Sequence, residues 1–282
     1  MAAYAYVGDN GPGTDVIVVS ATHPGTGLAL TDTVTAVWAN SAPICDAGGP
    51  YMVTVDGDTA MVMLDASGSS DADGDTLTYA WSVDVEGASL DDPAAVMPQL
   101  TLTGAALCAD SLMVDLMVTD GFDTTACVAV IQLDDARPPV VEITDDPHVI
   151  WPPNHKYVTV TPDMFIASVE DACGRPVDLM AAVEVLMVRS DEPEDCTGDG
   201  RFLEDIVIDC DGSVMVRAER RGGGDGRVYE ITYRVTGENE ASTDVSAFVH
   251  VPHDASGRMV GDDGDAGYTV EADCDDEEKP RD

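Results

Sequence analysis

The sequence predicts an all-β protein made of tandem β-sandwich modules and ending in an acidic flexible tail. Short apolar stretches with a period of two, such as LMVDLMV and CVAVIQL, indicate half-buried strands. Clusters of Gly, Pro and Asp separate these stretches at regular intervals, as in a sandwich. Two Pro-containing linkers, 40–43 and 137–139, divide the 282 residues into modules of ordinary domain size.

The composition narrows the class of protein. The hydrophobic fraction of 44% is enough for packed cores, so global disorder is not expected. The chain has 13 Lys and Arg against 54 Asp and Glu, a net charge of -41. Phosphates would be repelled, so nucleic acid and anionic membranes are excluded as partners, and bound cations or a salty medium are favoured. No run approaches the length of a membrane span. The first residues lack the pattern of a signal peptide, so an exported protein would be longer than this chain.

Residues 1–40 predict only two or three strands. Asp15–Ala21 and Thr31–Trp38 alternate like strands and flank the turn sequence HPGTG. Two or three strands cannot close a sandwich by themselves. The pattern YVGDNGPGTDVIVVSA followed by LTDTVTAVW resembles the last strands of an invasin-type bacterial immunoglobulin-like module. The resemblance implies that residues 1–40 are the C-terminal strands of a truncated module.

Residues 41–136 predict a complete sandwich. Its expected strands are Tyr51–Val55, Ala60–Asp65, Thr76–Asp84, Met97–Thr103, Ser111–Thr119 and Thr124–Leu133. Tyr79 and Trp81 alternate toward the core of this module. NSAP, LDASGSSDADGDTLTYAW and VTDG resemble the PKD (polycystic kidney disease) domain over residues 40–135. That resemblance implies a seven-strand immunoglobulin-like sandwich of the kind that serves secreted and surface proteins as a spacer or adhesion module.

The sequence also predicts a calcium site in this module. Asp71, Asp73 and Asp75 alternate around Gly74, and closely spaced carboxylates suit a hard cation with oxygen ligands. The resemblance to PKD domains implies the ligands Asn40, Ser41, Asp71, Asp73 and Asp120, and does not include Asp75. In such a sandwich the preceding linker and the two loops lie at one end. The alternative is that these Asp-Gly loops are only turn formers. A weaker candidate for a cation combines Asp199 with Glu204 and Asp205.

Residues 137–254 predict a second immunoglobulin-like sandwich. Its expected strands are VVEIT, KYVTV, AAVEVLMV, EDIVI, SVMVRAE, RVYEITYRV and TDVSAFVHV. WPPNHK, SDEPED, TGDG and VPHD resemble a poorly characterised module of bacterial secreted proteins, and no activity follows from that resemblance. The glycines of Arg221–Gly226 favour a hairpin connection. Arg217, Glu219, Arg220 and Arg227 are expected to form cross-strand pairs around it.

No catalytic constellation emerges from the sequence. His148 and His155 flank WPPN, and His250 and His253 flank VP, a spacing that allows a two-His metal site or a His/Asp base. Nothing pairs these histidines with a nucleophile in a known motif, so no enzyme is predicted. Residues 255–282 are rich in Gly and Asp and predict a solvated, disordered acidic tail.

The seven cysteines favour disulfides and an oxidising compartment. None forms a Cys-x-x-Cys pair, which argues against zinc ribbons and thioredoxin-like motifs. In immunoglobulin-like sandwiches the first strand often runs parallel beside the last, which brings Cys45 to the height of Cys127 and predicts that pair. Cys173 is expected to pair with Cys210, although Cys196 is an equally available partner.

Two functions fit the sequence. One is a non-catalytic, calcium-stabilised spacer or adhesion region of a secreted or cell-surface bacterial protein, with a protein or polysaccharide as its partner. The other is an accessory carbohydrate-binding region of a secreted hydrolase. Sugar-binding modules usually expose a strip of aromatic side chains, and only 5% of this chain is aromatic.

Overall fold

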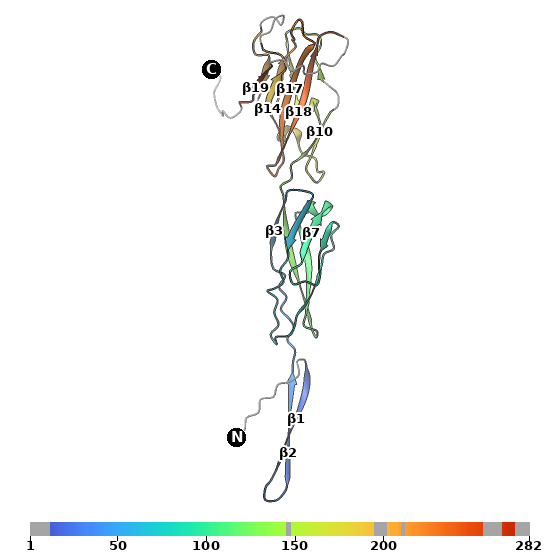
Figure 1. Ribbon diagram of the computed structural model, residues 1–282, viewed down its shortest axis with the longest axis vertical. Coiled ribbons are helices and arrows are strands. Elements are labelled where there is room, and N and C mark those ends of the chain that lie inside the picture. Colours follow the sequence, from blue (N-terminus) through green and yellow to red (C-terminus); the bar gives the residue numbers. More distant parts are fainter. Residues whose placement is uncertain (1–11, 145–147, 195–201, 210–211, 256–266, 274–282) are drawn as a thin grey trace. The chain divides into compact units, whose positions relative to one another are not determined.

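The computed structural model describes residues 12–144, 148–194, 202–209, 212–255 and 267–273 (Figure 1). The chain divides into two compact units, which we call unit 1 (Met1–Asp135) and unit 2 (Ala136–Asp282). In the described residues, strands predominate and the helices are single short turns, namely η1 (Gly104–Cys108), η2 (Pro162–Met164) and α1 (Leu179–Ala182). The predicted all-β, immunoglobulin-like fold is confirmed. No helix in the described part is long and apolar enough to cross a membrane.

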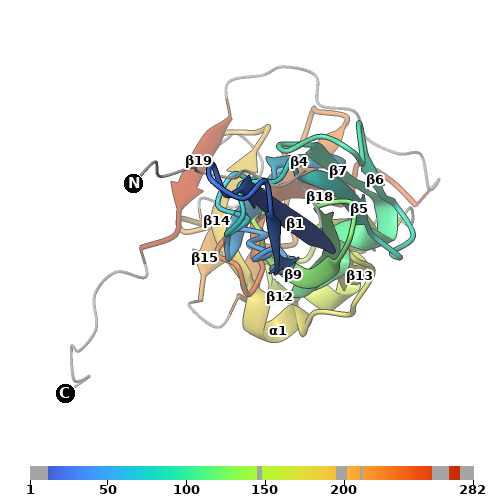
Figure 2. The same ribbon diagram turned by 90° about the horizontal axis from the view of Figure 1, so that it is seen from below.

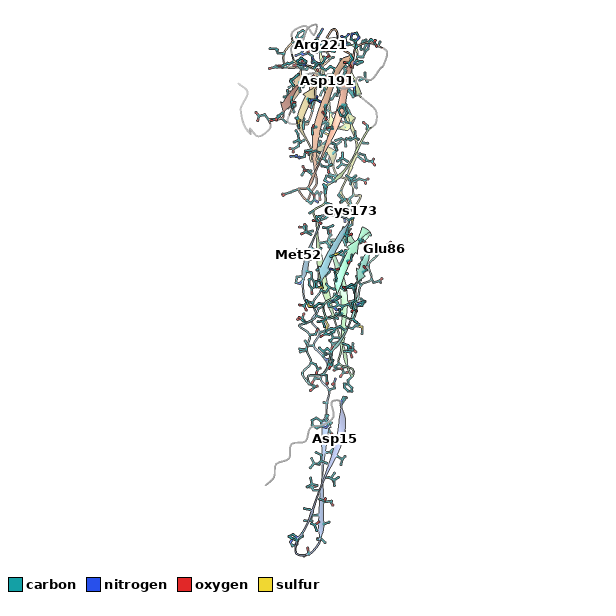
Figure 3. All side chains as sticks on the ribbon, in the orientation of Figure 1. Asp15, Met52, Glu86, Cys173, Asp191 and Arg221 are labelled. Atoms are coloured by element: carbon teal, nitrogen blue, oxygen red, sulfur yellow. A yellow bond between two sulfur atoms is a disulfide. The ribbon has the colours of Figure 1, made fainter. Side chains whose placement is uncertain are left out.

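Unit 1 begins with a hairpin of two ten-residue strands, β1 (Gly13–Thr22) and β2 (Ala29–Trp38). Among the described residues, no third strand pairs with either of them. The indole Nε1 of Trp38 donates a hydrogen bond to Asp15 Oδ2 at 2.8 Å across the pair, and Figure 3 labels Asp15 on β1. The two predicted strands are therefore present, while the separation of residues 1–40 from 41–136 as a module stays a prediction.

The rest of unit 1 is a sandwich of two sheets. One sheet has the order β3-β9-β8-β5 and the other has the order β4-β7-β6. The strands are β3 (Tyr51–Val55), β4 (Thr59–Met63), β5 (Thr78–Ser82), β6 (Ala88–Leu90), β7 (Gln99–Thr103), β8 (Ser111–Thr119) and β9 (Thr124–Asp135). The first strand β3 runs parallel to the last strand β9, as in immunoglobulin-like folds.

Alternation explains how these strands form the core of unit 1. On β8 the side chains of Leu112, Val114, Leu116 and Val118 are buried, and those between them are exposed. Trp81 on β5 is buried in the same core, and its Nε1 donates to the carbonyl of Ala95 at 3.1 Å. The inward orientation predicted for Tyr79 and Trp81 agrees with their packing on this core.

Unit 2 has a larger sheet with the order β11-β18-β17-β14-β19 and two smaller sheets, β12-β16-β15 and β10-β13. Its strands are β10 (Val140–Ile143), β11 (His148–Val149), β12 (Tyr157–Val160), β13 (Ile166–Glu170), β14 (Val183–Ser190), β15 (Ile206–Ile208), β16 (Val214–Arg217), β17 (Gly226–Thr236), β18 (Ser242–Pro252) and β19 (Tyr268–Glu271). The core lies between the larger sheet and the β12-β16-β15 sheet, because side chains of β16, β17 and β18 belong to one buried cluster.

Two expectations for unit 2 are wrong. The Gly-rich segment 221–226 is no hairpin, because β16 and β17 lie in different sheets. Glycines permit a turn but do not decide which strands it joins. Nor is the whole tail irregular, since β19 pairs with β14 and its Tyr268 and Val270 pack on the core. Figure 2 shows β19 beside β14. The Gly and Asp residues around this short strand concealed its alternating pattern.

Candidate metal centre

The acidic loop of unit 1 connects β4 to β5 and is shaped by its own carboxylates. Asp71 Oδ1 accepts hydrogen bonds from the backbone N–H groups of Asp73 (2.8 Å) and Asp75 (3.2 Å). Gly74 lies between them with φ +80°, a conformation that suits glycine. This folding gathers the three side chains, so that a carboxylate oxygen from each lies within 4.8 Å of the others.

The linker before the sandwich joins this loop and a second one. The backbone N–H of Ser41 donates to Asp73 Oδ2 at 2.7 Å. The amide Nδ2 of Asn40 donates to Asp120 Oδ2 and to Asp123 Oδ2, both at 2.8 Å. The linker therefore contacts the β4–β5 loop through Ser41 and the β8–β9 loop through Asn40.

The electrostatics of the two loops differ. Hydrogen bonds from Asn40 and from the backbone of Asp123 and Phe122 lower the pKa of Asp120, so this side chain stays ionised. Desolvation and the charges of Asp71, Asp120 and Asp73 raise the pKa of Asp75. Asp75 thus experiences the repulsion of three neighbouring carboxylates, which a bound cation would relieve.

Unit 1 has no lysine or arginine side chain that could neutralise these carboxylates. None of the 13 Lys and Arg residues lies before Arg137, so unit 1 contains neither residue type. The oxygen Asp71 Oδ2 is buried, and among the described residues it has no hydrogen-bond partner. Carboxylate and amide oxygens are the ligands that Ca²⁺ prefers, so the residues present fit this ion.

The structure adds two residues to the site predicted from the sequence. Asp75, which the resemblance did not include, shares the cluster of Asp71 and Asp73. Asp123 was missed, although it lies in the same turn as Asp120 and its backbone N–H donates to Asp120 Oδ1 at 2.7 Å. The signal available in the sequence was a second Asp three residues after Asp120.

The weaker cation candidate is not supported. Asp199 lies outside the described residues. Asp205 is fully buried and forms ion pairs with Arg227 Nη1 at 2.6 Å and with Arg217 Nε at 3.3 Å. A carboxylate already paired with two guanidinium groups offers little to a metal ion.

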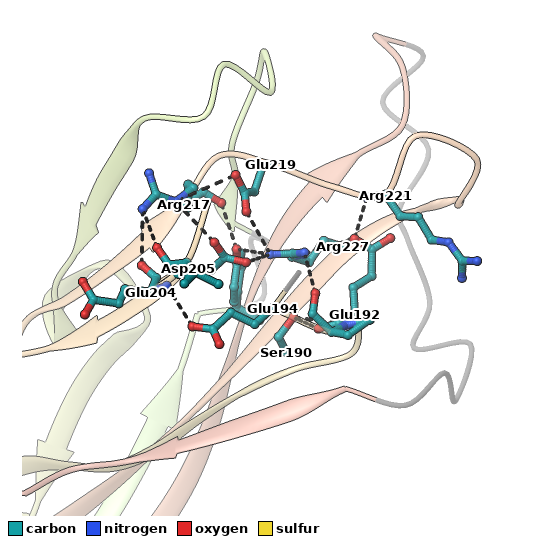
Figure 4. A network of polar contacts seen from close by, with 12 residues as sticks. Ser190, Glu192, Glu194, Glu204, Asp205, Arg217, Glu219, Arg221 and Arg227 are labelled. Atoms are coloured by element: carbon teal, nitrogen blue, oxygen red, sulfur yellow. Dashed lines mark hydrogen bonds and ion pairs between the residues drawn. The ribbon is translucent and has the colours of Figure 1, made fainter. Parts of the chain in front are cut away.

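The charged residues expected to pair around a hairpin are buried inside unit 2. Arg227, Asp205 and Glu219 have fully buried side chains, and Arg217 is 11% exposed (Figure 4). The guanidinium group of Arg217 also stacks on Tyr157, 4.2 Å from the ring centroid. The prediction of cross-strand pairs around a hairpin is therefore wrong, because the segment between β16 and β17 crosses from one sheet to the other.

His148 and His155 occupy separate environments. The ring of His148 packs edge-on against Phe165, and burial lowers its pKa. His155 stacks near Phe202, and its Nδ1 lies 3.3 Å from Glu219 Oε2. Neither contact forms the two-His metal site considered from the sequence.

The predicted bond between Cys45 and Cys127 is present in unit 1, with a Cα–Cα distance of 5.8 Å. Cys108 and Cys173 are also disulfide-bonded. Cys210, the partner expected for Cys173, lies outside the described residues, as does Cys196. The pair Cys173–Cys210 therefore stays a prediction.

Comparisons with known proteins find similar structures at low identity. Neither a protein-family model nor a curated protein matches the sequence. Protocadherin gamma B2 extracellular cadherin domains 1–5 match with a TM-score of 0.46 and 14% identity, over 84% of this chain and 45% of that chain. Human protocadherin-24 EC1-2 matches with a TM-score of 0.45 and 15% identity, over 76% of this chain and 98% of that one.

A third similar structure is a nucleoside hydrolase-related hypothetical protein from Saccharophagus degradans. Its TM-score is 0.28 and its identity is 22%, over 34% of this chain and 26% of that protein. The chain therefore spans about a quarter of this protein and under half of the protocadherin gamma B2 structure.

Proposed function

We propose that the chain is a non-catalytic spacer or adhesion region of a secreted or cell-surface bacterial protein, and that Ca²⁺ stabilises its PKD-like module. The ion is held by Asn40, Ser41, Asp71, Asp73 and Asp120, with Asp75 as an additional carboxylate. One observation carries this proposal. The linker residues Asn40 and Ser41 are hydrogen-bonded to the two acidic loops, so residues from three separate segments come together at one end of the sandwich.

The chemistry of the chain supports an extracellular location. A disulfide such as Cys45–Cys127 persists in oxidising compartments and is rare in the cytosol. Calcium is bound weakly by many extracellular modules, at millimolar or submillimolar concentrations. An ion shared by a linker and two loops restricts the linker, which suits a protein that spaces or presents other domains. The partner in that role is a protein or polysaccharide surface.

We expect Ca²⁺ to raise the melting temperature of the full chain and EDTA to lower it. An ion at about 100 times its dissociation constant adds roughly 2.7 kcal/mol to the free energy of unfolding. The site variant is Asp71→Asn/Asp73→Asn, which keeps the shape of the loop because Asn retains an oxygen that can accept the bonds made by Asp71 Oδ1. The measurement is thermal unfolding with buried Trp81 as the fluorescent reporter.

The matched control is Asp56→Asn/Asp58→Asn, which removes the same charge from exposed positions of unit 1. It should respond to Ca²⁺ as the wild type does, whereas the site variant should lose the response. NaCl of equal ionic strength measures general screening of the acidic surface. Equal melting temperatures of the wild type in Ca²⁺ and in EDTA would contradict the proposed calcium site. So would a site variant whose melting temperature still rises with Ca²⁺ as much as that of the wild type.

A further inference from the structure

Unit 2 buries more carboxyl groups than guanidinium groups in one cluster. Asp205 and Glu219 are fully buried and Glu192 is 6% exposed, and they face Arg227 and Arg217 (Figure 4). Arginine stays protonated in proteins. If all three carboxyl groups were ionised, one buried negative charge would lack a guanidinium group to neutralise it, which is costly in a protein interior.

The contacts indicate which carboxyl group is neutral. Asp205 forms close ion pairs with both arginines, at 2.6 and 3.3 Å. Glu192 Oε2 accepts from Arg227 Nε at 3.1 Å and from the backbone N–H of Arg221 at 2.7 Å. Glu219 is farther from both guanidinium groups, at 3.7 and 3.8 Å; its Oε2 lies 3.3 Å from the imidazole Nδ1 of His155, and within the described part its Oε1 has no hydrogen-bond partner. The proton therefore resides on Glu219.

The groups around Glu219 agree with this assignment. Burial raises the pKa of Glu219 to about 9, and a hydrogen bond with the Asp205 carboxyl group and its negative charge add to the effect. The remaining groups facing it are His155, Arg217 on β16, and Arg227 and Tyr229 on β17.

Strand β19 lies beside this cluster, and its Tyr268 interacts with Asp205 and Arg227. The hydroxyl of Tyr268 is buried, has no hydrogen-bond partner among the described residues, and feels the charge of Asp205. Gly267, just before the strand, lies so close to the carbonyl of Ser190 that a Cβ would not fit. In the described part β19 is only four residues long and pairs with β14 alone. Among the elements beside the cluster, β19 is therefore the easiest to detach.

We propose that Glu219 and β19 form a pH-sensitive latch, in which the neutral Glu219–Asp205 pair keeps β19 in place and ionisation of Glu219 releases it. An ionised Glu219 would be a buried charge with no guanidinium group closer than 3.7 Å, and detaching β19 lets water reach it. The carboxyl group binds its proton more tightly in the closed state. The stabilisation is therefore complete below the ordinary pKa near 4.5 and is lost as the pH rises toward 9.

The test is hydrogen–deuterium exchange of the full chain at pH 7 and pH 9, with rates corrected for the intrinsic effect of pH. We expect the protection factor of the peptide covering residues 267–273 to fall at least tenfold in the wild type. Glu219→Gln keeps a neutral side chain of the same shape, so its protection should stay constant between the two pH values. Asp244→Asn removes an exposed carboxylate on β18 and should behave as the wild type.

Equal protection at both pH values in the wild type, or the same loss in Glu219→Gln, would overturn the latch. If Glu219→Gln does not fold, infrared spectroscopy of the wild type tests whether a buried carboxyl group is protonated. A carbonyl band from a protonated carboxyl group should be present at pH 7 and vanish at high pH together with the protection of 267–273. Absence of that band at pH 7 would contradict the proposal.

Discussion

Replacing Arg227 with methionine is expected to lower the free energy of unfolding of unit 2 by about 3–5 kcal/mol. Arg227 is fully buried and neutralises Asp205, at 2.6 Å, and Glu192, at 3.1 Å. It also donates to the carbonyl of Pro193 and to the hydroxyl of Tyr229. Methionine preserves much of the volume but leaves these acceptors without their donor. The measurement is exchange of the β17 core amides, which reports unfolding of unit 2 within the full chain.

The matched control is Arg234→Met on the same strand. Arg234 pairs with Asp244 at 2.8 Å, but both side chains are more than 40% exposed. Such surface pairs contribute about 0–1 kcal/mol, so this variant should differ little from the wild type. Comparable losses in Arg227→Met and Arg234→Met would show that the buried pairs contribute no more than the exposed one.

The strands were predictable where side chains alternate over several residues. Ser111–Thr119 is predicted with the observed bounds of β8, because a buried residue follows each exposed one. Strand β6 was missed, since Ala88–Leu90 is too short to show a period. Short edge strands form because a neighbouring strand offers backbone partners, and that information is not local.

The buried charged residues of unit 2 show a second limit of prediction from the sequence. Residues 227, 229, 231, 233 and 235 of β17 are all buried, but burial alternates strictly only from Tyr229 to Thr236, because Gly226 and Val228 are buried as well. Arg227 has the parity of the inward-facing residues, whereas the general rule that charged residues are exposed argued against its burial. The sequence did not indicate which residues pair with Arg227, because Asp205 and Glu192 lie 22 and 35 residues away from it.

The candidate metal centre was predictable from the sequence only in part. The spacing of Asp71, Asp73 and Asp75 indicated a cation without further knowledge. The involvement of Asn40 and Asp120 came from a resemblance, and their hydrogen bond spans 80 residues. Asp123 follows from neither source, because its role depends on how the β8–β9 turn folds back toward the linker.

Removing the disulfide of unit 1 is expected to have a similarly large effect. Cys45 and Cys127 are 82 residues apart, and in the chain-entropy model closing a loop of this length contributes about 4–5 kcal/mol. We expect Cys45→Ala/Cys127→Ala to lower the free energy of unfolding of unit 1 by an amount of this order. Both side chains pack against the core, so lost contacts add to the entropic effect.

Exchange of the β8 amides in the full chain measures this loss, and the β17 amides of unit 2 serve as an internal control. The two cysteines join the segment before β3 to β9, the strand with which β3 pairs in parallel. Reduction should therefore first expose β3, which among the described strands pairs with β9 alone. Unchanged protection of β3 and β8 in the double variant would mean that core packing fixes this parallel pair without the cross-link. A loss confined to β3 would instead show that the bond secures the edge of the sandwich and contributes little to its global stability.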